Sequence, residues 1–489
     1  MTHRLWLLED ETARGWVPFS ETRPVGELLF GASRLRERIA GTLGMPVAGY
    51  LAPEALEGFT EEGTPPVVPL DQVGPADEVR VVLSSRTVLE FPTHGEAHGP
   101  VAGVPSAREA LEAGLARASG RSSQGAQGEA PPDAPVRIRV GGEAAGWILP
   151  PATPLPPEGP DAGEWAQTVE PAGEVELPGH LLAAPWTLVA DNAGQLRRDL
   201  ALPPPLAALE GTGTDTGRRT GSAGAGDSAR DAVRTLLPAH PGVEFLGDHP
   251  ITSGGPVEVD PQVILDAREG PIHLEAGVKI RAFTHLRGPA FIGAGTTLLG
   301  GLMESLSVGP GCKLRGEISE SVILGWSNKA HDGYLGHALV GSWVNLGAGT
   351  TNSDLKNNYS PVRVPVGVER EVDTGLLKVG IFLGDHVKTG IGTLLSTGTQ
   401  AGAGSNIFGG GGVPPRWIPP FSWGPTPPGS GPGPEGGFQR YDLPRFLETT
   451  SRVMGRRGQA LSPGMTRVLT RAWERTHGPA GRLPGERDV

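Results

Sequence analysis

Apolar residues recur at every sixth position over much of the second half of this 489-residue chain. Small residues, often glycine, follow many of them, as in Ile292-Gly293 and Leu346-Gly347. A period of six fits neither an α-helix, which repeats every ~3.6 residues, nor an alternating strand. It predicts a parallel β-helix in which three six-residue sides make a coil of about 18 residues. The series includes Leu274, Ile280, Leu286, Ile292 and Leu298, and later Leu383, Thr389, Leu395, Ala401 and Ile407.

The first two hundred residues follow a different pattern. Residues 4–8 and 79–85 are apolar and rich in strand-forming side chains, and acidic or turn-forming residues end them. Between them, residues 33–44 predict a helix with Ser33 as its N-cap. Residues 177–202 predict a strand, a turn and a second helix. Strand, helix and strand in this order favour an α/β layer with a parallel sheet.

Polar segments interrupt both patterns and divide the chain. The stretches 118–135, 150–164 and 210–228 contain too few apolar residues to fold, and we interpret them as flexible inserts or linkers. Residues 351–378 break the six-residue period and predict a loop, and 413–437 predict an extended Pro-rich strap. We therefore expect an α/β domain at 1–205, a linker at 206–242, a β-helix at 243–412, and the strap with short terminal helices at 413–489.

The last helix is expected to begin at Ser462-Pro463, since proline suits the first turn of a helix. Its apolar stripe predicts packing against the rest of the protein rather than a binding surface. The stripe consists of Met465, Val468, Leu469, Ala472 and Trp473.

Composition excludes several classes of function. The net charge is −12 with no dense Lys/Arg block, so we expect no nucleic-acid partner. The single cysteine, Cys312, excludes an internal disulfide and a cysteine metal cluster. The N-terminal segment lacks the pattern of a signal peptide, and no apolar run is long enough to span a membrane. The sequence therefore predicts a cytoplasmic protein without a membrane partner.

The segment PFSETRP at residues 18–24 resembles the stretch after the phosphate loop of sugar-1-phosphate nucleotidylyltransferases, whose fold is Rossmann-like. That family holds nucleotide phosphates with a glycine-rich loop and Mg²⁺ with an aspartate. At the matching positions this chain has Glu9, Asp10, Glu11 and Ala13 for the loop, Val25 for a lysine, and Arg86 for the aspartate.

These departures remove the usual phosphate and metal ligands from the N-terminal domain. Carboxylates repel phosphates, so we expect weak or absent Mg²⁺-dependent nucleotidyl transfer. Arg23 and Arg86 remain candidates for holding a nucleotide or sugar phosphate. The alternative is that both arginines are structural.

Residues 327–359 are unusually rich in polar side chains for a β-helix, which needs only aliphatic residues and turn formers. His331-Asp332-Gly333-Tyr334-Leu335-Gly336 and Asn345-Leu346-Gly347-Ala348-Gly349-Thr350 resemble the acetyltransferase motif of the GlmU-like family. These are the bifunctional N-acetylglucosamine-1-phosphate uridyltransferase/glucosamine-1-phosphate acetyltransferases. Residues 406–424 also resemble a strap that follows the last coil in a branch of this family.

The resemblance implies a left-handed β-helix and a set of roles for the motif. His331 would be the general base, while Tyr334 and Asn345 would hold the sugar phosphate. Lys329 lies one residue closer to the histidine than the family lysine, and Glu317 falls at a matching polar position. Loop residues that would close over the sugar are Asn352, Lys356, Asn357 and Asn358.

The implied chemistry is acyl transfer from acyl-CoA, such as acetyl-CoA, to an amino-sugar-1-phosphate. An imidazole can accept a proton from the attacking amine near neutral pH. Acyl-CoA sites in this fold lie between neighbouring β-helices, which implies a homotrimer. A zinc site built from His331, His337 and His386 is a rival hypothesis, but a six-residue separation puts the first two on adjacent sides of a coil.

Two alternatives to acyl transfer remain at this point. In one, nucleotidyl transfer from an NTP to a sugar-1-phosphate is the true activity, and the β-helix only oligomerises the protein. In the other, the protein is a non-catalytic sensor of sugar phosphates or nucleotides that reuses an enzyme scaffold.

Overall fold

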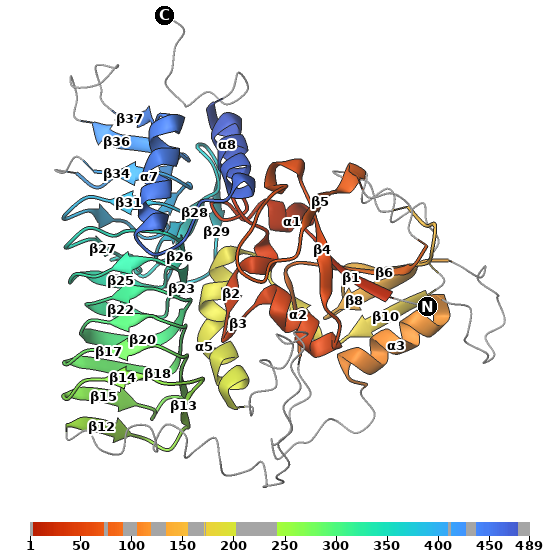
Figure 1. The fold of residues 1–489 in the computed structure, drawn as a ribbon, viewed down its shortest axis with the longest axis horizontal. Helices are drawn as coiled ribbons and strands as arrows, with labels where there is room; N and C mark the ends of the chain where they lie inside the picture. Colours follow the sequence, from red (N-terminus) through yellow and green to blue (C-terminus); the bar gives the residue numbers. More distant parts are fainter. Residues whose placement is uncertain are drawn as a thin grey trace, which may run out of the picture.

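The computed structural model describes residues 3–72, 77–90, 105–118, 134–154, 171, 173–201, 242–408, 412–426 and 437–477. An α/β part lies beside a tall parallel β-helix, and two helices stand at one end of the β-helix (Figure 1). The predicted α/β and β-helix fold is confirmed. The inserts predicted at 118–135 and 150–164 lie largely outside the described residues, and the one at 210–228 lies wholly outside them. None of the helices in the described ranges is long and apolar enough to cross a membrane.

Seven strands form the N-terminal sheet, in the order β10-β8-β9-β6-β1-β4-β5. The predicted strands at 4–8 and 79–85 are β1 and β6, which pair in parallel. β4 and β5 extend the parallel part, whereas β9 runs antiparallel to β6 and β8. The bounds are β1 (His3–Leu8), β4 (Val47–Ala52), β5 (Val67–Pro69), β6 (Val79–Ser84), β8 (Val136–Val140), β9 (Glu143–Leu149) and β10 (Gly173–Leu177).

The predicted helix at 33–44 is present but begins later. Ser33 and Arg34 form β3 (Ser33–Arg34), which pairs with β2 (Leu29–Phe30), and the helix begins at Leu35, so Ser33 lies one residue before the N-cap. Arg34 is the N-cap instead, and its amide donates to Glu37 Oε2 at 3.0 Å. The prediction for 177–202 is confirmed by β11 (Gly179–Leu181) and a long helix. The helices of this part are α1 (Glu11–Arg14), α2 (Leu35–Leu43), α3 (Ala107–Ala118) and α5 (Pro185–Ala201).

One face of the β-helix is a stack of nine parallel strands within the described residues. The residues of the predicted six-residue repeat are buried and point into the interior of the coils. The nine strands are β12 (Val243–Leu246), β15 (Val263–Asp266), β18 (Thr284–Ile292), β20 (Gly301–Val308), β23 (Val322–Gly325), β26 (Leu339–Ser342), β30 (Phe382–Leu383), β33 (Gln400–Ala401) and β35 (Trp417–Ile418).

Shorter strands form the other sides of the coils. One side contains β14 (Glu258–Val259), β17 (Lys279–Ile280), β19 (Thr297–Leu298), β21 (Lys313–Leu314), β24 (Asn328–Lys329), β31 (Lys388–Thr389), β34 (Asn406–Ile407) and β36 (Ser422–Thr426). Further strands are β13 (Ile251–Ser253), β16 (Ile272–Leu274), β22 (Glu317–Ser319), β25 (Tyr334–Gly336), β27 (Thr351–Asn352) and β32 (Leu394–Leu395). The loop predicted at 351–378 begins two residues later than expected, because β27 pairs in parallel with β32 as part of a coil. The chain then leaves the coil and forms a hairpin of β28 (Arg363–Pro365) and β29 (Glu371–Asp373).

The β-helix continues beyond the boundary predicted at residue 412. β35 pairs in parallel with β33, and β36 pairs in parallel with β34, so the predicted strap adds another layer of coil. The aliphatic Ile418 takes the inward position in this layer and is fully buried. The sequence pattern did not predict this layer, because the prolines of residues 413–426 are typical of an extended segment. β36 then pairs with β37 (Gly437–Arg440) in antiparallel orientation.

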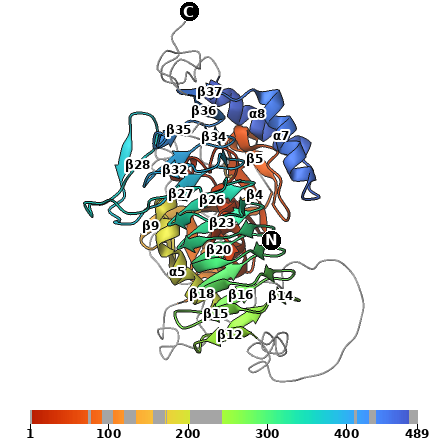
Figure 2. The same ribbon diagram turned by 90° about the vertical axis from the view of Figure 1, so that its left-hand side faces the viewer.

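The two parts of the protein share a hydrophobic core. Phe19, Phe30 and Leu188 of the α/β part belong to the same buried cluster as Leu339 and Phe382 of the β-helix. Helix α5 lies along β18 and β20 (Figures 1 and 2). Ser307 Oγ donates to the main-chain oxygen of Gly31 at 2.7 Å. One face of the β-helix is therefore covered by the same chain.

The C-terminal helices α7 (Leu443–Gly455) and α8 (Pro463–His477) close one end of the molecule. The predicted stripe of α8 is confirmed as packing. Val468 joins the core of the N-terminal sheet, whereas Leu469 and Ala472 pack in a cluster with Phe421 and Phe446. Helix α8 therefore contacts both parts of the protein.

Candidate active site

The polar motif of residues 327–359 is spread over two adjoining faces of the β-helix. Glu317 and Tyr334 are register partners of β22 and β25, so they lie one coil apart on the same face. Asn345 instead stacks between Asn328 and Lys388 on the face of β24 and β31. His331 is exposed in the segment that joins these faces. The structure thus brings Glu317 and Tyr334 together but places Asn345 on the adjoining face. The segment around His331 forms the corner between these two faces.

Lys329 supports the corner from the inside. Its side chain is buried, and Nζ donates to the main-chain oxygens of Arg315, at 3.1 Å, and of His331. Burial lowers the pKa of Lys329 to about 8. The imidazole of His331 makes no recorded hydrogen bond within the described part of the chain. Lys329 therefore positions the main chain of His331, and the imidazole faces solvent.

Tyr334 is held by a network that sequence reasoning missed. Its hydroxyl donates to Asp354 Oδ2 at 2.7 Å and lies 3.0 Å from Ser319 Oγ. The same Asp354 oxygen lies 2.7 Å from Nδ1 of His337. The pKa of Asp354 is lowered from its usual value. Burial acts to raise this pKa, but the hydrogen bonds from His337 and Tyr334 have the larger combined effect. The carboxylate is thus kept ionised between two donors.

A coil length of 17 residues explains this network. His337 and Asp354 are 17 residues apart, as are Asn328 and Asn345. Each residue therefore lies directly below its partner in the next coil. The 17-residue spacing of His337 and Asp354 can be seen in the sequence. The predicted coil of about 18 residues, however, would pair His337 with Leu355. His337 also adopts a left-handed backbone conformation at its corner, with a φ of 49°.

The loop after β27 begins beside Tyr334. Asn352 is buried, and its amide group exchanges two hydrogen bonds of 3.0 Å with the main chain of Gly336, which makes it structural. Lys356 Nζ donates to the main-chain oxygen of Pro361 at 2.7 Å, and Asn358 Oδ1 accepts from Ser360. Asn357 is exposed at the tip. Among these loop candidates, Asn357 is the best placed to meet a ligand.

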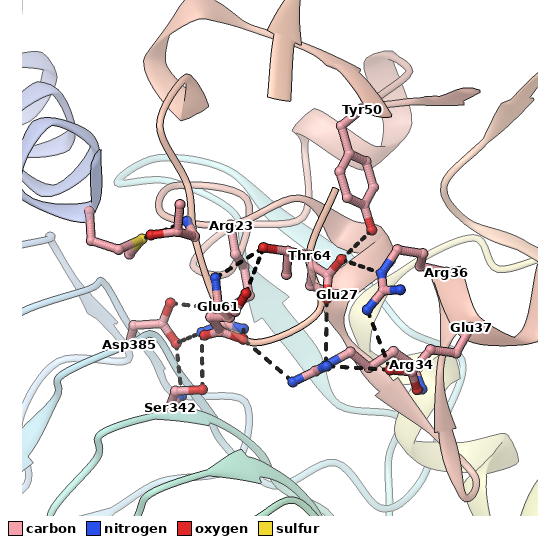
Figure 3. A network of polar contacts seen from close by, with 12 residues as sticks. Arg23, Glu27, Arg34, Arg36, Glu37, Tyr50, Glu61, Thr64, Ser342 and Asp385 are labelled. Carbon is pink, nitrogen blue, oxygen red and sulfur yellow. Dashed lines mark hydrogen bonds and ion pairs between the residues drawn. The ribbon is translucent and has the colours of Figure 1, made fainter. Parts of the chain in front are cut away.

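The Arg23 side chain points toward Asp385 and Ser342 of the β-helix (Figure 3). Its Nε and Nη2 donate to the two oxygens of Asp385 at 3.0 and 2.9 Å, and Nη2 also donates to Glu61 at 2.9 Å. Burial would lower the pKa of Arg23, but Asp385 and Glu61 raise it. The Arg23 and Asp385 side chains are almost fully buried. The structure therefore accounts for Arg23 as a link between the two parts of the protein.

Arg86 is similarly paired within the N-terminal part. Its Nε lies 3.0 Å from Asp10 Oδ1, and Nη1 donates to the main-chain oxygen of Leu182 at 2.6 Å. Asp10 also accepts from Ser84 Oγ at 2.6 Å and from the amide of Ala13, where it caps α1. A guanidinium thus stands at the position that the motif resemblance assigns to a metal-binding carboxylate. The residues present therefore do not fit Mg²⁺.

The histidines of the zinc hypothesis are not gathered into a site. His331 is exposed at its corner, and His337 is bound to Asp354. His386 is buried and stacked on Trp343, with the ring centroids 6.4 Å apart. In the ranges that the structure describes, no group of three or more histidine, cysteine or acidic side chains is arranged around a common point.

Comparisons with known proteins agree with the resemblance seen in the motifs. A bifunctional sugar-1-phosphate nucleotidylyltransferase/acetyltransferase of Sulfurisphaera tokodaii is 37% identical over 92 residues, which are 19% of this chain and 23% of that protein. The bifunctional protein GlmU of Methanococcus aeolicus is 31% identical over 106 residues, 22% of this chain and 24% of its own length. GlmU of a Synechococcus strain is 30% identical over 186 residues, 30% and 27% respectively. No family model matches the chain.

These matches confirm the similarity to GlmU-like proteins. The chain spans about a quarter of the length of the curated relatives that it matches.

Proposed function

We propose that the protein is a transferase of sugar-nucleotide biosynthesis that moves an acyl group from acyl-CoA to the amine of an amino-sugar-1-phosphate. The observation that carries the proposal is the polar corner of the β-helix. There His331 is exposed between the Tyr334 face and the Asn345 face, and an exposed Asn357 stands on the adjacent loop. The similarity to proteins named for nucleotidylyl and acetyl transfer supports the same assignment.

The proposed reaction requires one proton acceptor and a set of groups that orient the sugar. The amine nitrogen attacks the thioester carbonyl carbon, the imidazole of His331 takes the amine proton, and the C–S bond breaks to release the CoA thiolate. The thiolate then takes a proton, so the products are the amide and free CoA. Tyr334 is held in one orientation by Asp354 and Ser319, and such fixed polar groups position a sugar at little entropic cost.

A second copy of the chain would complete the site. Tyr334 and Asn345 belong to different faces, so one substrate cannot rest flat against both in a single chain. A β-helix packed against the corner would form a groove with residues from both copies. The face built from β18, β20 and β23 is already covered by the α/β part, which leaves the motif faces for this contact. We therefore expect a homotrimer.

A turnover screen tests the proposed function. Acetyl-CoA with glucosamine-1-phosphate is expected to release free thiol. The same protein with UTP, Mg²⁺ and a sugar-1-phosphate is expected to release pyrophosphate far more slowly than an ordinary enzyme rate of about 10 per second. This difference follows from the Asp10–Arg86 pair in place of the metal site. Rapid pyrophosphate release without thiol release would instead identify a nucleotidyltransferase with an oligomerising β-helix.

Tyr334→Phe is expected to weaken sugar-phosphate binding more than it slows the chemical step. The change removes the hydroxyl that contacts Asp354 and Ser319, so we expect KM for the sugar phosphate to rise about tenfold, as for the loss of one well-placed hydrogen bond. Asn345→Ala should act in the same direction. Tyr441→Phe is a matched control, because it removes a hydroxyl bonded to Thr449 in the C-terminal cluster. Equal KM values for the two Tyr variants would contradict the role of Tyr334.

A further inference from the structure

The chain that follows helix α7 contacts the face of the β-helix on which Asn345 lies (Figures 1 and 2). Arg457 comes shortly after the end of α7, and its Nη1 donates to the main-chain oxygen of Gly311 at 2.9 Å. Its Nη2 donates to Asn328 Oδ1 at 2.6 Å. Gly311 precedes β21, which pairs with the β24 strand of Asn328. One guanidinium group therefore ties the C-terminal segment to two consecutive coils.

The turn after α7 fixes the position of Arg457. Its amide donates to the main-chain oxygen of Met454 at 2.9 Å, and the amide of Gln459 donates to the same oxygen at 3.0 Å. Gly458 between them has a φ of 70°, a left-handed conformation that glycine adopts without strain and that commonly ends a helix. The main chain therefore limits where the Arg457 side chain can reach.

The contact with Arg457 sets the orientation of two side-chain amides. A guanidinium group only donates, so it must meet the carbonyl oxygen of Asn328, and the NH₂ group of Asn328 is left for its neighbour. Asn328 Nδ2 donates to Asn345 Oδ1 at 3.3 Å. The two residues also form a parallel bridge, so their side chains lie one above the other. The Oδ1 of Asn345 is therefore occupied, and its Nδ2 faces outward.

This orientation decides what kind of group Asn345 can bind. Asn345 is exposed, and the structure records no acceptor for its Nδ2 among the residues that it describes. An NH₂ group binds an oxygen that accepts, such as one of a phosphate. Lys388 pairs with Asn345 one coil further on, and its Nζ donates to the main-chain oxygen of His386 at 3.1 Å. Lys388 and Arg457 thus add positive charge to the same face.

We propose that Arg457 is a positioning residue for the candidate site, because it orients the Asn345 amide to donate to an oxygen of the sugar phosphate. The inference rests on the proposed function, since it concerns the residue that the motif assigns to the sugar phosphate. Without Arg457, the Asn328 amide can rotate by half a turn, and Asn345 can then present its own oxygen. That oxygen would repel the oxygens of a phosphate. The C-terminal segment therefore contributes to substrate binding.

The kinetics of thiol release from acetyl-CoA, with glucosamine-1-phosphate varied, test this role. Arg457→Ala is expected to raise KM for glucosamine-1-phosphate about three- to tenfold, as for the loss of one hydrogen bond, with little change in kcat. Arg457→Lys keeps one donor for Asn328 and should recover part of the loss. Arg456→Ala is the matched control and should keep the wild-type KM. Arg456 is the exposed neighbour, and no hydrogen bond of its side chain is recorded in the described ranges.

A double-mutant cycle separates positioning from a structural effect. Arg457→Ala should raise KM little further in the Asn345→Ala background, because the amide that Arg457 orients is then absent. If Arg457 only held α7 in place, its replacement would raise KM by the same factor in both backgrounds and would lower the melting temperature. That result would exclude the positioning role.

Asn345→Asp tests the direction of the hydrogen bond to the substrate. Aspartate keeps an oxygen for Asn328 and removes the NH₂ group, so the variant is expected to raise KM at least as much as Asn345→Ala. A KM below that of the wild type would show that Asn345 accepts a hydrogen bond from the substrate, and it would overturn the proposal.

Calorimetric titration with glucosamine-1-phosphate distinguishes failure of this inference from failure of the proposed function. Additive effects of Arg457→Ala and Asn345→Ala on the affinity, with thiol release by the wild type, would refute the positioning role and leave acyl transfer intact. Conversely, the wild type could release no thiol while its affinity depends on Arg457 only when Asn345 is present. Acyl transfer would then be refuted and the positioning role would stand. Absence of binding to the wild type would overturn both.

Discussion

Replacing His331 with alanine is expected to lower the rate of acyl transfer by about 10²–10⁴-fold, the range for loss of a general base. The melting temperature should hardly change, because the exposed imidazole contributes little packing, and the loss of stability should stay below about 1 kcal/mol. The measurement is thiol release from acetyl-CoA together with thermal unfolding. His249→Ala is a matched control, since His249 is exposed near the first coil, far along the β-helix from the motif.

His337 provides the critical comparison. Its imidazole is bound to Asp354, so His337→Ala is expected to lower both the rate and the stability, the latter by about 1–3 kcal/mol because the Asp354 carboxylate loses one of its two donors. A wild-type rate in His331→Ala, with a large loss in His337→Ala, would transfer the proton-accepting role to His337. A large loss of melting temperature in His331→Ala would make that histidine structural.

Asp385→Ala is expected to destabilise the protein by about 3–5 kcal/mol, because it leaves the buried charge of Arg23 without its main partner. Asp385 also accepts from Thr22 Oγ1 at 2.7 Å and from the amide of Ser342 at 2.8 Å. The change therefore removes contacts on both sides of the boundary between the two parts. Chemical denaturation measures the loss of unfolding free energy.

Two variants sharpen this test. Glu112→Ala breaks the ion pair with Arg108, whose side chains are 64% and 61% exposed, and should change stability by less than about 1 kcal/mol. Replacing Arg23 and Asp385 together by leucine should recover part of the loss, since both buried charges are removed and Glu61 keeps Arg34 at 3.7 Å. If Asp385→Ala cost no more than Glu112→Ala, the pair would not hold the two parts together.

The β-helix could be predicted because its signal is local and repeated. Each inward position must be apolar, and each corner needs a small residue or a left-handed backbone, so the pattern recurs every six residues whatever the rest of the chain does. The same rule failed at 413–426, where prolines and glycines interrupt the repeat although Ile418 still points inward. It also gave an 18-residue coil where 17 is found around the motif.

The candidate site could be predicted only in part, because the sequence pattern did not give the correct number of residues in each coil. The linear spacing of His331, Tyr334 and Asn345 is a property of the sequence, and it singled out residues 327–359 as the candidate segment. Which residues share a face depends on how many residues each coil contains. The contact of His337 with Asp354, and the separation of Tyr334 from Asn345, follow from that count rather than from any local preference.

The sequence by itself thus determined the two kinds of architecture and the segment with the candidate chemistry. The tertiary structure decided what the charged residues of the N-terminal part do. Arg23 matched a nucleotidyltransferase motif, yet it pairs with Asp385, 362 residues away, and Arg86 pairs with Asp10, 76 residues away. Local patterns record backbone preference and burial, which neighbouring residues set. The partner of a buried charge depends on which surfaces pack together. Before that packing is known, many distant carboxylates are compatible with the same arginine.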